Sequence, residues 1–261
     1  MANIHNSKVH LGITWKDIYL FLCIFSYMTS AYGFIHFLSF IVDMSNGIRP
    51  NFSDMLIYMF MFGIGGQLGK FFWQRREIYA SGARGETMVV SSLSNMLPDR
   101  YSIYRNVRVH EKMECDFVIV GENGVFLVEC KNYNGTLVGD MDDNEWTLEK
   151  VGQKGGEYSK KIRNPVKQLK RNVSILSRYF KMEGCSAWIE GYVCFPSTKT
   201  ISLISSPMIG DTKYIASLIV NYVPKHHLSP RKIEAIKDSL EKCILEHPAM
   251  TKNEFEEHRA V

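Results

Sequence analysis

One stretch near the N-terminus limits what this chain can fold into more than any other feature. Ile18 to Val42 is a run of 25 residues without Asp, Glu, Lys or Arg, and His36 is its one ionisable side chain. A helix of this length crosses a hydrocarbon layer of about 30 Å. We therefore expect a membrane-spanning helix over about residues 18–42, with His36 facing another helix because polar groups in a membrane seek partners.

A second apolar stretch, at about residues 55–73, follows a short polar connection. It contains Lys70 near its end, where a long side chain can reach the interface. Two buried helices of a soluble protein are an alternative, and so is a cleaved signal peptide for the first stretch. The first stretch is too long for a signal peptide, and neither shows the polar stripe of a globular helix. Close approach of the two helices is expected at the glycines Gly63, Gly65, Gly66 and Gly69.

Basic residues lie at the outer ends of the two stretches, whereas the connection between them carries only Arg49 as a base. Cytoplasmic flanks of membrane helices carry an excess of Lys and Arg. This bias predicts an anchoring region over residues 1–78 in a multi-pass protein of the cell inner membrane, with both termini in the cytoplasm. The basic flanking residues are Lys8, Lys16, Lys70, Arg75 and Arg76.

The middle of the chain contains a clear hairpin pattern. The apolar runs 117–120 and 125–128 flank Asn123-Gly124, a pair that readily takes the positive φ angles of a tight turn. We expect a buried antiparallel hairpin with its turn at this pair.

Folding this hairpin brings Asp116, Glu129 and Lys131 to the same end. Side chains alternate along a strand, so Glu129 and Lys131 share one face and Cys130 points to the other. Two acids and a lysine beside apolar strands are costly to bury unless they are paired or hold a metal. A solvent-facing Glu-x-Lys ion pair is the alternative, since exposed pairs of this kind are common.

These side chains suit metal-dependent phosphodiester chemistry. Asp116 and Glu129 can bind Mg²⁺ through hard oxygen ligands and leave positions open for water and a phosphate oxygen. Lys131 can orient or help deprotonate the attacking water and offset the charge that builds on phosphorus. Glu86, in the first turn of a helix expected over 85–97, could reach the same metal. A first-turn acid favoured by the helix dipole is the alternative for Glu86.

The charge distribution downstream is uneven. From Lys150 to Lys181, ten Lys or Arg residues oppose the single acid Glu157, whereas residues 140–149 hold five carboxylates and no base. We expect this basic window to contact the phosphate backbone in a salt-sensitive way. Its first part, residues 150–163, reads as a basic loop rich in glycine. The following Asn164 and Pro165 start a helix that has an apolar stripe. Gln168 and Asn172 share another face of this helix.

The remaining elements are predicted from shorter patterns. Asp140 to Asn144 is a solvated turn, and a calcium loop is a weak alternative because the glycine and terminal glutamate of an EF-hand are missing. The six cysteines are scattered and are expected to be reduced thiols. His226-His227 is expected at the surface, and the last dozen residues are expected to be frayed. The expected strands and tail helix are Tyr101–Val109, Thr136–Val138, Trp146–Leu148, Trp188–Phe195, Ile201–Ile204 and the helix 229–246.

Several of these features, in a fixed order, resemble the nuclease-related domain (NERD), a branch of the PD-(D/E)XK nuclease superfamily. The resemblance covers roughly residues 82–195. The proline that often precedes the first acid of the superfamily is absent, since Glu114-Cys115 stands there. The matching residues are Gly85-Glu86, the block from Asp116 to Lys131 continuing as Asn132-Tyr133-Asn134-Gly135, Trp146, and Asn164-Pro165-Val166-Lys167-Gln168.

The resemblance implies an α/β, restriction-endonuclease-like fold with a mixed central sheet flanked by helices, after the N-terminal two-helix transmembrane hairpin. We expect the nuclease-like domain over residues 82–223 and a C-terminal helical tail over 224–261. The resemblance also implies catalytic roles for Asp116, Glu129 and Lys131 with the accessory residues Glu86 and Gln168, and metal ligation by Asp116, Glu129 and Glu86.

The sequence therefore predicts a membrane-anchored nuclease that cleaves DNA or RNA on the cytoplasmic side with Mg²⁺, for which Mn²⁺ can substitute. A non-catalytic membrane-bound module that binds nucleic acid or protein is the alternative, and a structural membrane protein is a third. The residues expected to bind nucleic acid are Lys160, Lys161, Arg163, Lys167, Lys170 and Arg171.

Overall fold

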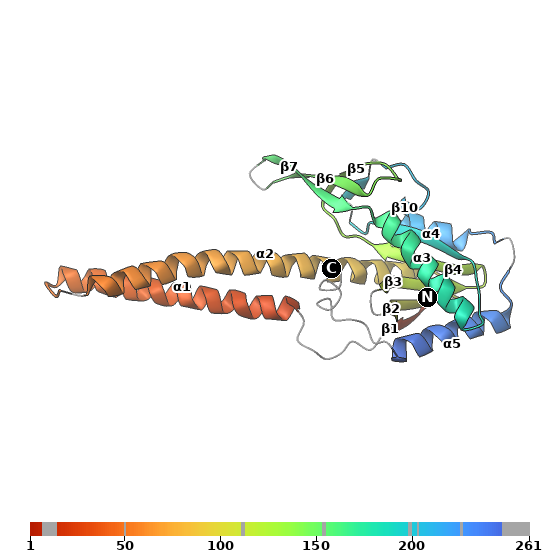
Figure 1. Cartoon of the computed structure of the whole chain (residues 1–261), viewed down its shortest axis with the longest axis horizontal. Helices are drawn as coiled ribbons and strands as arrows, with labels where there is room; N and C mark the ends of the chain where they lie inside the picture. Colours follow the sequence, from red (N-terminus) through yellow and green to blue (C-terminus); the bar gives the residue numbers. More distant parts are fainter. Residues whose placement is uncertain are drawn as a thin grey trace. The chain divides into compact units, whose positions relative to one another are not determined.

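The computed structural model describes residues 1–6, 15–49, 51–110, 113–152, 155–197, 200–202, 204–224 and 227–246 (Figure 1). The chain divides into two compact units, one of Ile13–Ser81 and one of Met1–Gly12 with Gly82–Val261. The expectations for Lys8, His226 and the last dozen residues lie outside the described residues.

The first unit contains two long apolar helices, α1 (Trp15–Ser45) and the first part of α2 (Phe52–Met96). Both are long and apolar enough to cross a membrane, and only 22% and 11% of their most apolar windows are buried. A core helix of a soluble protein is mostly buried, so this exposure is compatible with the expected hairpin of spans. His36 stacks on Tyr58 of α2 with ring centroids 4.8 Å apart, as expected for a polar side chain that faces the other helix.

Glycines allow α1 and α2 to approach closely. A Cβ added to Gly65 would stand 2.8 Å from the carbonyl oxygen of Ser26, and one added to Gly69 would stand 2.8 Å from the Tyr27 ring. A Cβ on Gly63 would meet no atom within 4 Å. The predicted role of the glycines therefore holds at Gly65 and Gly69 and not at Gly63.

Helix α2 is longer than the sequence pattern predicts. We expected one helix to end near Trp73 and another to begin at Gly85, but α2 continues from Phe52 to Met96 without a break. A glycine inside a helix costs only about 1 kcal/mol relative to alanine, so Gly85 does not interrupt it. The helix ends just before Pro98, because proline cannot donate the backbone hydrogen bond.

The second unit is built on a mixed six-stranded sheet with the order β1-β2-β3-β4-β8-β10. Strands β2, β3 and β4 are antiparallel, whereas β1 pairs with β2, and β8 with β4 and β10, in parallel. The predicted mixed α/β fold with a central mixed sheet is confirmed. The strands are β1 (Asn3–Asn6), β2 (Ser102–His110), β3 (Met113–Gly121), β4 (Gly124–Cys130), β8 (Ile189–Cys194) and β10 (Ile209–Gly210).

Helices cover both faces of this sheet. One core cluster joins the sheet to α3 (Pro165–Met182) and α5 (Pro230–Glu246). The other joins the opposite face to the last turns of α2, through Val89 and Leu93, and to α4 (Thr212–Val220). Helix α3 starts as predicted, with the Asn164 side chain accepting a hydrogen bond from the backbone N–H of Val166.

A second, four-stranded sheet has the order β7-β6-β5-β9. Residues 157–163, which we expected in a loop, form a strand paired with β6 over seven residue pairs. This prediction was wrong because pairing with β6, and not the local glycine and lysine content, decides the conformation. We call the β6–β7 hairpin the arm; it is labelled in Figure 1. The strands are β5 (Gly135–Val138), β6 (Glu145–Val151), β7 (Glu157–Arg163) and β9 (Thr200–Ser202).

The N-terminal strand β1 was not expected. It pairs with β2, and the backbone N–H of Ala2 donates to the carbonyl oxygen of Ser94 over 3.0 Å. The first residues thus belong to the same compact unit as the sheet, whereas the sequence analysis grouped them with the anchoring region. Helix α5 lies in this unit as well, and it matches the helix expected over 229–246.

Candidate active site

The β3–β4 hairpin forms as predicted, with its turn displaced by one residue. Gly121 pairs with Gly124, which leaves Glu122 and Asn123 as the two connecting residues. Asn123 does not adopt a positive φ; its amide donates to the carbonyl oxygen of Ile219 over 2.7 Å. The asparagine therefore ties the turn to α4 and does not supply the turn geometry that we expected.

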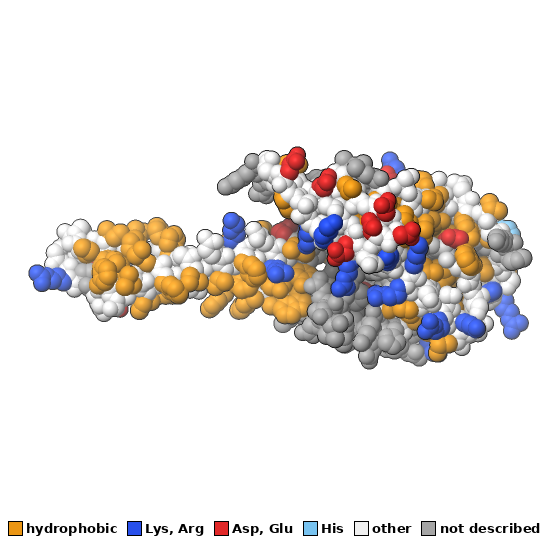
Figure 2. Space-filling view, turned by 45° about the horizontal axis from the view of Figure 1, so that its top comes forward, with side chains coloured by type: hydrophobic (Ala, Val, Ile, Leu, Met, Phe, Trp, Pro, Cys, Tyr) orange, Lys and Arg blue, Asp and Glu red, His pale blue; other side chains and the backbone are white. Residues whose placement is uncertain are grey.

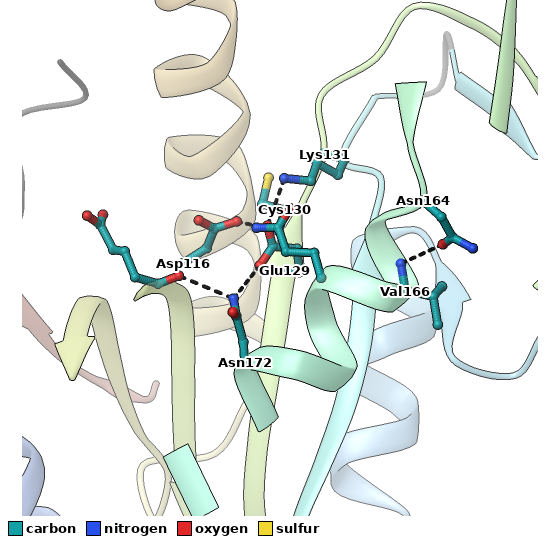
Figure 3. Close-up of polar contacts among 9 residues, drawn as sticks. Asp116, Glu129, Cys130, Lys131, Asn164, Val166 and Asn172 are labelled. Atoms are coloured by element: carbon teal, nitrogen blue, oxygen red, sulfur yellow. Dashed lines mark hydrogen bonds and ion pairs between the residues drawn. The ribbon is translucent and has the colours of Figure 1, made fainter. Parts of the chain in front are cut away.

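The two strands separate where the predicted acids stand. Their pairing runs from Gly121 opposite Gly124 to Phe117 opposite Val128, and the next facing positions are Asp116 and Glu129. There the backbone N–H of Cys130 donates to Oδ2 of Asp116 over 2.7 Å (Figure 3). The Asp116 side chain thus holds the two strands together at the end of their ladder.

The alternation of side chains along β3 shifts at Asp116. Cys115 and Val118 are three residues apart, yet both pack in the same core cluster. The neighbouring strand β2 holds Asn106 in the left-handed region, with φ of 52°, between positions paired with this part of β3. Side chains therefore do not alternate strictly between the two faces of the sheet in this part of β2 and β3. This irregularity sets the direction of the Asp116 side chain.

Glu129 is the most enclosed member of the predicted site, with 1% of the residue exposed. Its Oε1 accepts hydrogen bonds from Lys131 Nζ, at 2.7 Å, and from the Gln168 amide. Its Oε2 accepts from Asn172 Nδ2 at 3.5 Å, and the same Nδ2 lies 3.3 Å from the carbonyl oxygen of Glu114 (Figure 3). The structure therefore gathers Glu129, Lys131 and Gln168 as predicted.

Asn172 is a further member of this cluster that the sequence analysis did not assign to the site. It is buried, and it links the carboxylate on β4 to the backbone of β3. The available signal was its position one turn after Gln168 on the same face of α3.

The neighbouring charges keep Lys131 protonated. Burial acts to lower the pKa of the Lys131 ammonium, but the carboxylates of Glu129 and Asp116 outweigh it and hold the pKa above its ordinary value. At neutral pH Lys131 is therefore a hydrogen-bond donor and a positive charge. In this state it can orient a phosphate or a water.

Glu86 approaches the end of β4 from α2. A Cβ added to Gly85 would stand 2.5 Å from Cβ of Asn132, so the helix passes close to the residue that follows Lys131. Burial, then the charge of Asp116 and, more weakly, that of Glu86 raise the pKa of the Cys130 thiol. Cys130 packs in the α2-side cluster, on the face opposite Glu129, as the alternation predicts.

The predicted set of three metal-binding carboxylates is not gathered. Among the residues that the structure describes, no three His, Cys, Asp or Glu side chains are grouped to hold a metal ion. Helix α2, which carries Glu86, packs on one face of the sheet, and α3, which contacts Glu129, packs on the other. Asp116 and Glu129 stand at facing positions, and Mg²⁺ commonly uses one or two carboxylates with several waters. The donor chemistry of this pair therefore fits Mg²⁺.

The predicted nucleic-acid-binding residues are all exposed but do not form one surface. On β7, Lys160 is paired with Leu148, whereas Lys161 is paired with Thr147 and donates to its hydroxyl over 3.0 Å. Facing residues point to the same side of a sheet and successive residues to opposite sides. Lys160 therefore lies on one face of the arm, and Lys161 and Arg163 lie on the other.

The three basic residues of α3 are placed differently. Lys167, Lys170 and Arg171 are exposed, and Lys167 Nζ donates to the Asn144 side chain over 2.6 Å. They lie on the helix that carries Gln168 and Asn172, so their backbone positions are fixed relative to Glu129.

Comparison with known proteins finds one family model whose match includes the residues of the candidate site. The family model described as nuclease-related domain matches residues 81–196, from the α2 turn before Glu86 to the end of β8. An uncharacterized protein of Bacillus anthracis is 36% identical over 70 residues, which cover 25% of this chain and 33% of that protein. The chain thus matches about a third of the length of that curated relative, and no solved structure matches. Over residues 81–196 the chain is therefore similar to the nuclease-related domain.

Proposed function

We propose that this protein is a Mg²⁺-dependent nuclease of the PD-(D/E)XK type, with a restriction-endonuclease-like domain, and that Mn²⁺ can replace Mg²⁺. The observation that carries the proposal is the contact of the buried Glu129 with Lys131 and Gln168, beside Asp116 at the facing position of β3. A buried acid and ammonium at the end of two strands are typical of a functional site, because burial without a role is costly.

Each residue has a separate task in this proposal. Asp116 and Glu129 hold the divalent cation, which supplies Lewis-acid stabilisation of the phosphate and activation of a bound water. The Lys131 ammonium binds a phosphate oxygen and offsets the negative charge that develops on it. Gln168 and Asn172 keep the Glu129 carboxylate in place, and Glu86 acts as an accessory acid.

Lys160 and the basic residues of α3, Lys167, Lys170 and Arg171, are the proposed contacts to the substrate backbone. They are exposed and lie on elements connected to the site. Such contacts release counterions, so we expect binding that weakens as the salt concentration rises.

We also propose that α1 and α2 anchor the enzyme in the inner membrane with the nuclease domain in the cytoplasm. Strand β1 precedes both helices and β2 follows them, and the two strands pair in one sheet. The segment between them must therefore cross the membrane an even number of times, which agrees with two spans. In this topology Asn46→Cys, in the connection, reacts with an impermeant maleimide in intact cells, whereas Glu122→Cys reacts only after permeabilisation.

Cleavage of nucleic acid by the purified full chain in detergent tests the enzymatic proposal. We expect turnover of a DNA or an RNA substrate with Mg²⁺ or Mn²⁺, and none with EDTA. Asp116→Asn keeps the size of the side chain and an acceptor for the Cys130 N–H, and it should abolish cleavage. Glu122→Gln removes the same charge from the exposed turn at the other end of the hairpin and should leave cleavage unchanged. Equal activity in both variants refutes the mechanism.

A binding module without turnover is the second candidate, and one observation favours it. The Glu129 carboxylate already accepts hydrogen bonds from Lys131, Gln168 and Asn172, which occupy positions that a cation would need. This candidate predicts salt-sensitive binding of nucleic acid with no cleavage under any divalent cation, and no heat of Mn²⁺ binding in calorimetry.

A further inference from the structure

The two faces of the arm differ in character. Facing pairs across β6 and β7 assign every described residue of the arm's two strands to one face or the other. The inner face, which continues into the core, carries Trp146, Leu148, Lys150, Tyr158, Lys160 and Ile162. The outer face carries Glu145, Thr147, Glu149, Val151, Glu157, Ser159, Lys161 and Arg163.

The inner face changes from buried to open along the arm. Trp146 and Leu148 are 0% and 2% exposed and belong to the core, whereas Tyr158 is 55% exposed near the tip. Tyr158 lies directly opposite Lys150, and Lys160 is its neighbour two residues along the same strand. An aromatic ring between two lysines therefore stands open on this face.

Charge also separates the faces. In β6 and β7 the inner face carries two lysines and no carboxylate, whereas the outer face carries three glutamates against Lys161 and Arg163. Figure 2 shows acidic and basic side chains interspersed over the second unit. A polyanion is thus attracted to the inner face and not to the outer one.

The inner face leads to the candidate active site. A Cβ added to Gly135 would stand 3.1 Å from Cγ of Lys150, so the stem of this lysine lies along the start of β5. Gly135 is four residues after Lys131, and Tyr133 between them packs against the same core cluster as Trp146. At most about 14 Å of chain therefore separates Lys131 from the position beside Lys150.

We propose that the inner face of the arm binds a single-stranded segment of the substrate, with an unpaired base stacked on Tyr158 and phosphates held by Lys150 and Lys160. Bases inside a duplex are already stacked on one another, so an exposed ring on a sheet can stack only on an unpaired base. This inference rests on the proposed function, and it names single-stranded nucleic acid as the substrate class.

Stacking is tested by binding, with cleavage blocked. The full chain in detergent with EDTA is titrated into a fluorescent single-stranded oligonucleotide, and anisotropy gives the Kd. Tyr158→Ala is expected to raise the Kd on the order of ten-fold, which corresponds to the loss of one stacked base. Tyr158→Phe keeps the ring and should bind like the wild type. Tyr158 is exposed, so both variants should retain the fold, which circular dichroism checks.

Two double variants separate the inner face from general attraction to basic residues. Lys150→Ala/Lys160→Ala and Lys161→Ala/Arg163→Ala remove the same charge from opposite faces. For single strands, log K falls with log salt concentration with a slope of about −0.7 per phosphate contact. The inner-face double variant should therefore make the slope less negative by about 1.4, whereas the outer-face double variant should leave it unchanged.

The outcomes distinguish this inference from the proposed function. Equal effects of the inner and outer pairs, or no effect of Tyr158→Ala, overturn it even if the wild type cleaves nucleic acid. A blunt duplex of the same length that binds with the same dependence on Tyr158 also overturns it. Loss of single-strand binding in the inner-face variants supports it even if no divalent cation produces cleavage, and in that case the proposed enzymatic function fails alone.

Discussion

Replacing Lys131 should lower the free energy of unfolding of the domain, in addition to its expected effect on cleavage. The residue Glu129 is 1% exposed, and the Lys131 side chain that pairs with it is 17% exposed. Breaking a buried ion pair by removing one partner costs about 3–5 kcal/mol, because the remaining charge is left without compensation. Gln168 and Asn172 still donate to the carboxylate, so we expect Lys131→Met to cost about 3 kcal/mol, at the lower end of that range.

The assay is urea and thermal unfolding of the full chain in detergent, followed by tryptophan fluorescence, since Trp146 is fully buried in the domain. A loss of about 3 kcal/mol lowers Tm by roughly 6–12 °C for a domain of this size. The double variant Glu129→Gln/Lys131→Met removes both charges and should be more stable than Lys131→Met alone. Cleavage by Lys131 variants must therefore be compared well below their Tm.

Lys242 provides a matched control. Its ammonium lies 3.1 Å from Glu183, but the Lys242 and Glu183 side chains are 51% and 28% exposed. A pair this open contributes about 0–1 kcal/mol, so Lys242→Met should shift Tm little. The reasoning about the buried pair is refuted if Lys131→Met costs no more unfolding free energy than Lys242→Met. It is also refuted if the double variant loses as much as the single variants Glu129→Gln and Lys131→Met added together.

Three further predictions concern the surroundings of the site. Gly85→Ala should lower the urea midpoint of unfolding, because the added Cβ would stand 2.5 Å from Asn132 Cβ. In an open helix alanine is favoured over glycine by about 1 kcal/mol, so a raised midpoint would contradict the close approach. Asn106→Val should cost about 1–2 kcal/mol of unfolding free energy at the left-handed φ, whereas Asn106→Gly should cost none of it. Burial, then Glu190, raises the pKa of Tyr192 to about 12 from 10.0. The stabilisation by its neutral phenol is therefore complete below pH 10 and lost as the pH rises through about 12. In Tyr192→Phe, unfolding measured over that pH range should show a smaller alkaline loss.

Much of the candidate site could be read from local sequence signals. The hairpin pattern brought Asp116, Glu129 and Lys131 to one end, and the cap at Asn164 placed Gln168 on the helix that reaches them. These predictions succeed because strand alternation, tight turns and helix capping depend on residues close together in the chain.

Other features of the site depend on contacts that no short pattern contains. The shift of alternation at Asp116 arises between two strands, and the link from Asn172 to Glu114 and Glu129 joins residues 58 and 43 positions apart. The packing of α2 and α3 on opposite faces of the sheet is likewise decided by contacts between distant parts of the chain.

The sequence by itself predicted two apolar helices before an α/β domain similar to the nuclease-related domain, and it predicted that Glu129, Lys131 and Gln168 lie together. Only the tertiary structure decided that β1, which precedes the helices in the chain, joins the sheet beside β2. It also decided that α2 runs unbroken to Met96, and that Lys160 and Lys161 lie on opposite faces of the arm. The physical reason is that pairing between distant strands fixes their direction and register, and this pairing outweighs the weak conformational preferences of the individual residues.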